Sequence, residues 1–211
     1  MRTRIKICGL TREEEVVKAV ELGVDAIGLV FHPASPRHVS LERAALLAGR
    51  VPPFVSLVGL FVNASSALIN EAIAACRLTV IQFHGDETPE ACRGWPCRVI
   101  KAVRVAGRGD LLGLERYQVE AFLLDAKVSG AFGGTGQRFD WSLLREWTVA
   151  KPLILAGGLH AENVGEALRQ VRPWAVDCSS GVEESPGRKD PLRMARFVEE
   201  VRSFDCGNGR G

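Results

Sequence analysis

The sequence predicts an α/β protein that forms a single (β/α)8 barrel, the TIM-barrel architecture, and three observations lead to this prediction. Short, nearly continuous apolar runs alternate with amphipathic stretches from end to end, which is typical of strands covered on both faces and joined by helices. No linker or low-complexity stretch divides the chain. The first apolar run is followed by CGLT, not by the GxGxxG turn of a dinucleotide-binding doubly wound sheet, and this disfavours the alternative fold.

Runs rich in Val, Ile, Leu or Phe mark the expected strands, because strands buried on both faces read as almost continuously apolar. The expected strands are Arg4–Cys8, Ala26–Phe31, Ser56–Val62, Val80–Phe83, Val99–Val103, Ala121–Asp125, Leu153–Ala156 and Ala175–Asp177. A chain of 211 residues is short for eight strand–helix units, so the connecting loops must also be short.

The amphipathic stretches between these runs predict helices. In the first, Val16, Val17 and Val20 share one face, and Thr11 with Glu14 has the spacing of a capping box. The expected helices are Glu13–Leu22, Leu41–Ala48, Ser65–Ala75, Glu90–Gly94, Asp110–Tyr117, Trp141–Trp147, Ala161–Val171 and Pro191–Phe204. We therefore expect one catalytic domain over residues 1–205 and a disordered tail over 206–211, where three of six residues are glycine.

Composition argues against several classes of function. The formal charge of +2 is close to balance, whereas binding to nucleic acid or an acidic membrane favours a clustered basic face. No apolar run approaches the ~20 residues that span a bilayer. The N-terminus MRTRIKICGL lacks the apolar region of a signal peptide. These features predict a cytoplasmic protein that binds neither nucleic acid nor a membrane.

The cysteines and histidines give no sign of a metal site or a disulfide framework. None of the six cysteines forms a CxxC pair, and their spacing matches no zinc motif. There is no HxH or HExxH signature. We therefore expect reduced thiols, no metal and no cofactor. Five of the cysteines are expected to be structural or unremarkable, and only Cys8 occupies a position suited to chemistry.

Polar groups or glycines follow the predicted strands at their carboxyl ends, where barrel enzymes carry their active sites. A GxSxG elbow is missing, which disfavours Ser–His–Asp hydrolysis. Some of these polar residues simply cap the helices that follow the strands. Because so many of them gather on one rim of the barrel, however, the sequence predicts an active site there. The residues at these ends are Cys8, His32, Arg37, His38, Asn63, His84, Gly85, Asp86, Arg104, Asp125, Lys127, Gly157, Gly158, Asp177, Ser179, Ser180 and Gly181.

Three glycine-containing clusters in consecutive late loops favour phosphate binding. They are GGTG at 133–136, Gly157-Gly158, and SSG at 179–181. Glycine lets backbone N–H groups approach an anion closely, and barrels often bind phosphate after their last strands. The GxxxxGK[ST] pattern of a nucleotide P-loop is missing. A phosphorylated small molecule is therefore the expected ligand.

Cys8 and Asp125 are the candidate acid–base pair. A thiol titrates near pH 8.5, so modest tuning would make Cys8 a usable base at neutral pH. Desolvation in the barrel mouth could hold the Asp125 carboxyl neutral so that it acts as an acid. Side chains alternate along a strand, so Lys6 should lie inside the barrel one layer below Cys8. Its buried ammonium needs a partner, and Asp177 on the last strand is the expected one.

Eight segments, in order and over nearly the whole chain, resemble the phosphoribosylanthranilate isomerase family of tryptophan biosynthesis. The combination of KICG with a late SSGVE-SPG-KD block is specific to that family. The segments are KICGLT at Lys6–Thr11, GLVFHPASPRHVS at Gly28–Ser40, GLFVN at Gly59–Asn63, QFHGDE at Gln82–Glu87, LLDAK at Leu123–Lys127, GGTGQRFDW at Gly133–Trp141, LAGGL at Leu155–Leu159, and VDCSSGVEESPGRKD at Val176–Asp190.

The resemblance implies an Amadori rearrangement of N-(5′-phosphoribosyl)anthranilate to 1-(o-carboxyphenylamino)-1-deoxyribulose 5-phosphate, without a metal or organic cofactor. Asp125 would protonate the furanose oxygen, and Cys8 would remove the C2′ proton. Arg37 would hold the anthranilate carboxylate. The full set of expected substrate-binding residues is Arg37, His84, Gly134, Thr135, Gly136, Gly157, Gly158, Asp177, Ser180 and Gly181.

Two alternatives remain open on the sequence alone. One is another phosphosugar barrel, such as the histidine-pathway isomerase, although that family uses two aspartates and this chain has Cys8 at the first position. The other is a non-catalytic barrel that binds a phosphometabolite, which would keep the glycine loops but lose Cys8, Asp125 or Arg37. The family contains both monomers and dimers, so either a monomer or a homodimer is expected.

Overall fold

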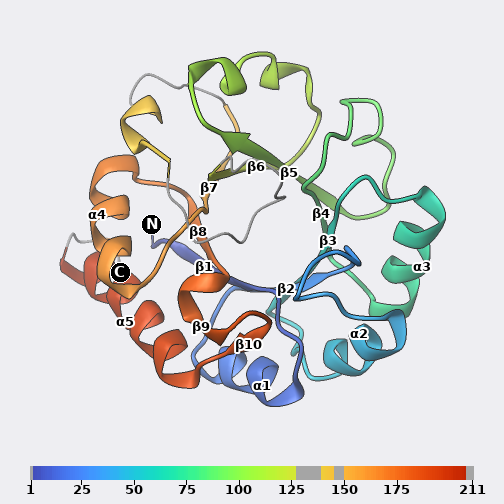
Figure 1. The fold of residues 1–211 in the computed structure, drawn as a ribbon, viewed down its shortest axis with the longest axis horizontal. Helices are drawn as coiled ribbons and strands as arrows, with labels where there is room; N and C mark the ends of the chain where they lie inside the picture. Colours follow the sequence, from blue (N-terminus) through green and yellow to red (C-terminus); the bar gives the residue numbers. More distant parts are fainter. Residues whose placement is uncertain (1, 127–138, 145–149, 208–211) are drawn as a thin grey trace.

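The chain forms a closed barrel of eight parallel strands, which confirms the predicted fold class. The computed structural model describes residues 2–126, 139–144 and 150–207. Strands β1 to β8 follow one another around the barrel in sequence order, and β8 pairs with β1 to close it. Figure 1 looks down the barrel and shows the strands as an inner ring with the helices outside.

The strands and helices lie close to their predicted positions. The barrel strands are β1 (Arg4–Cys8), β2 (Ala26–Val30), β3 (Ser56–Phe61), β4 (Val80–Phe83), β5 (Arg98–Val105), β6 (Ala121–Ala126), β7 (Leu153–Leu155) and β8 (Ala175–Cys178). The helices are α1 (Glu13–Glu21), α2 (Leu41–Ala48), α3 (Ser66–Cys76), α4 (Ala161–Val171) and α5 (Pro191–Gly207). No helix of the described residues is long and apolar enough to cross a membrane.

Three predicted helices on one side of the barrel are not α-helices. Residues 90–94 form only turns. The segment 110–117 is split into two 3-10 helices, Arg108–Leu111 and Leu114–Arg116, because Gly113 between them has a φ of 76° that a regular helix cannot contain. Trp141–Leu144 is a single 3-10 turn, and residues 145–149 lie outside the described part of the chain.

Both ends of the helical pattern also differ from expectation. The first helix is capped by Glu15, whose carboxylate accepts the backbone N–H groups of Thr11 and Arg12, so the predicted Thr11–Glu14 capping box is wrong. Helix α5 continues through Gly207, so the first two residues of the predicted tail are helical, and 208–211 lie outside the described residues. An unpredicted hairpin, β9 (Glu183–Ser185) with β10 (Arg188–Lys189), follows β8.

Apolar side chains fill two regions, one on each side of the barrel wall. The larger core, which includes Ile5, Ile27 and Leu155, lies between the strands and the helices. A smaller cluster, which includes Ile100, Leu123 and Ile154, fills the barrel interior. Successive residues of a strand face opposite sides, so each strand contributes to both regions, and this explains its nearly continuous apolar sequence.

A buried ion pair joins the first and last strands inside the barrel, as the sequence predicts. The register of β1 against β8 sets Lys6 directly beside Asp177. The Lys6 Nζ lies 2.9 Å from the Asp177 Oδ1, and both side chains are less than 9% exposed. Burial alone would lower the pKa of Lys6, but the Asp177 carboxylate and the Cys8 thiol group outweigh it, so the pKa of Lys6 is raised.

Removing either charge of this pair should strongly destabilise the barrel, because the other charge would remain buried without a partner. We expect Lys6→Met to lower the free energy of unfolding by about 3–5 kcal/mol, measured by urea unfolding. The double variant Lys6→Met/Asp177→Asn should regain much of this loss. The matched control is Lys18→Met, which breaks an exposed pair with Glu21 and should change stability by less than about 1 kcal/mol. Equal effects at both lysines would contradict this account.

Candidate active site

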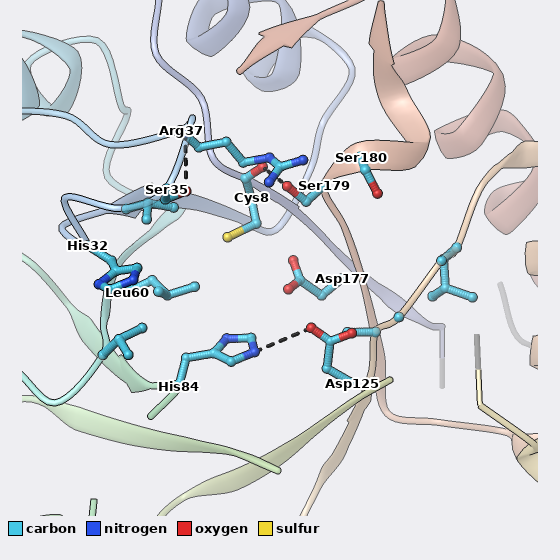
Figure 2. Close-up of a pocket in the computed structure, with 16 residues that line it drawn as sticks. Cys8, His32, Ser35, Arg37, Leu60, His84, Asp125, Asp177, Ser179 and Ser180 are labelled. Atoms are coloured by element: carbon cyan, nitrogen blue, oxygen red, sulfur yellow. Dashed lines mark hydrogen bonds and ion pairs between the residues drawn. The ribbon is translucent and has the colours of Figure 1, made fainter. Parts of the chain in front are cut away.

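A single pocket at the carboxyl ends of the strands gathers most of the predicted site residues. Figure 2 shows the Cys8 thiol pointing into this pocket, with Asp177 near it and Asp125 farther away, beside His84. The predicted residues that line it are Cys8, Arg37, His84, Asp125, Gly157, Gly158, Asp177 and Ser180. They come from the ends of β1, β4, β6, β7 and β8 and from the loop after β2, so chain segments far apart in sequence meet at one rim.

The thiol of Cys8 is buried, and its environment keeps it protonated in the free protein. Burial raises the pKa of the Cys8 thiol, the Lys6 ammonium lowers it, and the Asp177 carboxylate raises it again. The net shift is upward, opposite to the tuning toward neutrality that the sequence suggested. Lys6 is nevertheless placed to stabilise a thiolate once one forms. Removal of its proton therefore depends on charges that arrive with a ligand.

Asp125 is held by the backbone on one side and faces a histidine on the other. Its Oδ1 accepts the N–H of Ala126 at 2.8 Å, and its Oδ2 lies 3.3 Å from Nε2 of His84. Gly157 packs against the first oxygen: a Cβ there would stand 2.7 Å from the Ala126 nitrogen and 3.0 Å from Oδ1. A side chain at Gly157 would thus crowd Asp125, and the φ of 81° at Gly157 adds strain.

The loop that carries His84 is braced from outside the barrel. The buried carboxylate of Glu87 accepts the backbone N–H groups of Asn63 and Gly85. The Lys101 Nζ donates to the Gly85 carbonyl at 2.7 Å and to Glu87 at 2.9 Å. These contacts fix the turn that directly follows His84, so its imidazole is presented to the pocket from a rigid base.

Arg37 lies at the pocket wall, but part of its guanidinium is already engaged within the protein. The Nε and Nη2 groups donate to the two carboxylate oxygens of Glu183 at 2.8 and 2.7 Å. Lys189 donates to the same carboxylate and to the Ser179 carbonyl. Burial would raise the pKa of Glu183, but Arg37 and Lys189 outweigh it and hold that pKa below its ordinary value. Glu183 therefore orients Arg37 as a fixed cation beside the site.

Four predicted residues are not among those that the structure assigns to this pocket, and three of them are not described at all. Gly134, Thr135 and Gly136 lie outside the described residues. Gly181 does not line the pocket formed by the described part of the chain. A Cβ at Gly181 would stand 1.9 Å from the Leu159 carbonyl oxygen, so its glycine is explained by the close packing of the loops after β7 and β8.

Sequence reasoning missed the residues that support the site from behind. Glu183, Lys189, Gln82, Glu87 and Lys101 are all buried polar groups next to pocket residues. Gln82, Glu87, Glu183 and Lys189 lie within motifs already noted, whereas Lys101 lies in a predicted strand, and their supporting contacts could not be read from those patterns. Lys101 alone gave a sequence clue, because it is a cation inside an otherwise apolar predicted strand. Among the described residues, no cluster of three or more His, Cys, Asp or Glu could hold a metal ion.

Comparison with known proteins identifies the family of this chain. Residues 5–200 match the family model for N-(5′-phosphoribosyl)anthranilate (PRA) isomerase. A relative from Magnetococcus marinus, named N-(5′-phosphoribosyl)anthranilate isomerase, is 51% identical over 99% of this chain and 100% of its own length.

Solved structures agree with the sequence comparison. The phosphoribosyl anthranilate isomerase of Thermotoga maritima is 40% identical, with a TM-score of 0.88 over 95% of this chain and 99% of its own; monomers derived from this dimeric protein give a TM-score of 0.83 at 37% identity over the same shares. A phosphoribosyl anthranilate isomerase in complex with reduced 1-(o-carboxyphenylamino)-1-deoxyribulose 5-phosphate is 38% identical, with a TM-score of 0.83 over 95% of this chain and 99% of that one.

Proposed function

The chain belongs to the N-(5′-phosphoribosyl)anthranilate isomerase family of tryptophan biosynthesis, and from this premise we propose how its residues divide the reaction. The substrate is N-(5′-phosphoribosyl)anthranilate, and the product is 1-(o-carboxyphenylamino)-1-deoxyribulose 5-phosphate. The observation that carries the proposal is that one thiol and one carboxyl, Cys8 and Asp125, line the same pocket from separate strands. A base and an acid on different walls suit a reaction in which one proton is given and another is taken.

Asp125 is the general acid that opens the sugar ring. It donates a proton to the furanose oxygen, the C1′–O bond breaks, and the nitrogen lone pair forms a protonated Schiff base. The Ala126 N–H on Oδ1 supports this assignment, because it leaves Oδ2 as the oxygen that carries the proton. Asp125 is only 6% exposed, and a closed site keeps solvent away from the proton that is transferred.

Cys8 is the general base that completes the rearrangement. Its thiolate removes the C2′ proton, the C–H electron pair forms the C1′–C2′ double bond, and the nitrogen becomes neutral. The resulting enolamine tautomerises to the ketone. Lys6 lowers the pKa of the thiol against the effect of burial, and the cationic Schiff base adds a second positive charge nearby. This cation favours loss of the thiol proton to the solvent, so the thiolate forms when the substrate has been opened.

The substrate's two anions are assigned to opposite sides of the pocket. We place the phosphate at the backbone of Gly157, Gly158 and Ser180, which line the pocket after β7 and β8, together with Gly134, Thr135 and Gly136. Arg37, oriented by Glu183, receives the anthranilate carboxylate. We propose that the reaction needs no cofactor and takes place in the cytoplasm, where a biosynthetic enzyme meets a free phosphosugar.

Single substitutions at the two reacting groups should each lower kcat far more than they change KM. Cys8→Ala removes the base, and Asp125→Asn keeps the shape of the acid without its proton, so each should cost about 10²–10⁴-fold in kcat. Arg37→Ala should instead raise KM. Steady-state kinetics, followed by the loss of substrate fluorescence, measures all three. Near-wild-type turnover in Cys8→Ala would show that the thiol is only packed core, and Asp177 would become the next candidate base.

We also propose that the chain forms a homodimer, as its Thermotoga maritima relative does. Phe54, in the loop before β3, is 100% exposed. On the same face of the barrel, the strand starts surround a largely apolar cavity whose lining includes Val80, Ile100 and Ile154. A two-fold pair of such faces can insert each Phe54 into the other copy's cavity. This would remove an aromatic side chain from water in both copies.

Replacing Phe54 by serine should dissociate this dimer without loss of turnover. We expect the wild-type chain to sediment at twice 22.9 kDa, and Phe54→Ser at 22.9 kDa. The matched control, Leu192→Ser, removes another exposed apolar side chain on α5 and should leave the mass unchanged. A wild-type chain that sediments as a monomer at micromolar concentration would refute the proposal.

A further inference from the structure

We propose that Gln82 and His84 form a positioning relay that stabilises the Asp125 carboxylate left behind when the sugar ring opens. This inference rests on the proposed role of Asp125 as general acid and deepens it. In this relay the Gln82 amide fixes one tautomer of His84, and the Nε2–H of that tautomer faces the oxygen on which negative charge develops. His84 then acts through Asp125, in place of the substrate-binding role that the sequence suggested for it.

The three side chains form a continuous line inside the barrel. Gln82 and His84 are two residues apart on β4 and its end, so both face inward. The Gln82 Nε2 lies 3.0 Å from Nδ1 of His84, and Nε2 of His84 lies 3.3 Å from Oδ2 of Asp125. Figure 2 shows the imidazole directed at the carboxyl group across the pocket floor. Because an amide NH2 only donates, Nδ1 accepts and the ring proton resides on Nε2.

Polar atoms of Gln82 and His84 that lack hydrogen-bond partners within the described residues suggest that these side chains serve the reaction. Gln82 is fully buried and His84 is 5% exposed, yet within the described part of the chain Gln82 Oε1 and His84 Nε2 have no hydrogen-bond partner. The His84 Nε2 lies 3.3 Å from Asp125 Oδ2, but the two groups are not aligned as a hydrogen bond. A buried donor without a partner is costly in a histidine that serves only packing. If the Nε2–H of His84 serves the reaction, it gains a hydrogen-bond acceptor when Asp125 becomes a carboxylate.

The second oxygen of Asp125 explains why this donor matters. Oδ1 already accepts the Ala126 N–H, so proton transfer from Oδ2 leaves the new charge facing His84. Donors fixed in advance toward developing charge lower the barrier without reorganisation. The Lys101–Glu87 brace behind the turn at Gly85 holds the imidazole in place. The proton passes from Asp125 to the ring oxygen, and His84 keeps its own.

Kinetics of substituted proteins separates this relay from a substrate contact. His84→Phe keeps a ring of similar size but has no N–H, and should lower kcat about 10²-fold with less than about threefold change in KM. Gln82→Met keeps the length of the side chain but frees the tautomer, and should lower kcat by up to about tenfold. The matched control, Gln170→Met, removes an exposed glutamine on α4 that bonds only Glu166 and should leave kcat unchanged.

The Asp125→Asn background shows whether His84 acts through Asp125. There, His84→Phe should lower the residual kcat by less than about twofold, because no carboxylate forms for it to stabilise. A further loss of about 10²-fold, or a rise in KM as the main effect of His84→Phe, would make His84 a substrate ligand and overturn the relay. The proposed function fails separately, if Asp125→Asn alone keeps its turnover.

A measurement on the wild-type protein avoids any effect of substitution on folding. In 15N-histidine-labelled protein, the His84 ring should show a proton bonded to Nε2 and none on Nδ1 at neutral pH. In Gln82→Met the same ring should show a mixture of tautomers. A wild-type His84 with its proton on Nδ1 would overturn the proposal, because Nε2 could then donate nothing to Asp125.

Discussion

The buried ion pair between Lys6 and Asp177 links the closure of the barrel to its chemistry. It connects β1 to β8 at the register where the sheet becomes continuous, and it lies one layer below Cys8. Two buried charges are tolerated because each neutralises the other. The same pair sets the field at the thiol, where the ammonium favours the thiolate and the carboxylate opposes it. A shift in this register would move both the base and the charges that surround it.

Burial of the Cys8 thiol has two opposite effects on its ability to act as a base. A buried thiol has a raised pKa, so few free molecules carry the thiolate at neutral pH, but a thiolate of higher pKa is also the stronger base. The substrate can favour formation of the thiolate, because ring opening creates a cation next to Cys8. Ring opening by Asp125 therefore precedes proton removal by Cys8 for two reasons: the chemistry requires this order, and the cation formed by ring opening is what favours the thiolate. The fixed surroundings of Asp125, with Ala126 on one oxygen and His84 near the other, suit that opening step.

Most of the barrel could be predicted from the periodicity of the sequence, and the pocket residues from their place at strand ends and from motifs that resemble a known family. Alternation along β1 and closure onto β8 were enough to pair Lys6 with Asp177. The supports could not be predicted in this way, because Glu183 reaches Arg37 across 146 positions of the chain. Gly181 was assigned to phosphate from its cluster, and the close approach of the Leu159 carbonyl oxygen is a second requirement for glycine that the sequence did not reveal. The missing α-helices after β4 and β5 show that apolar spacing alone does not determine a helix where glycines interrupt the segment.

The central claim is that Asp125 and Cys8 act on different bonds in successive steps. The most direct measurement is the primary isotope effect on kcat with substrate deuterated at C2′, compared between two weakened variants. In Cys8→Ser the C–H bond should break in the slowest step, so a large isotope effect is expected. In Asp125→Asn ring opening should limit the rate, and the effect should fall close to unity. Equal isotope effects in the two variants would contradict the division of labour.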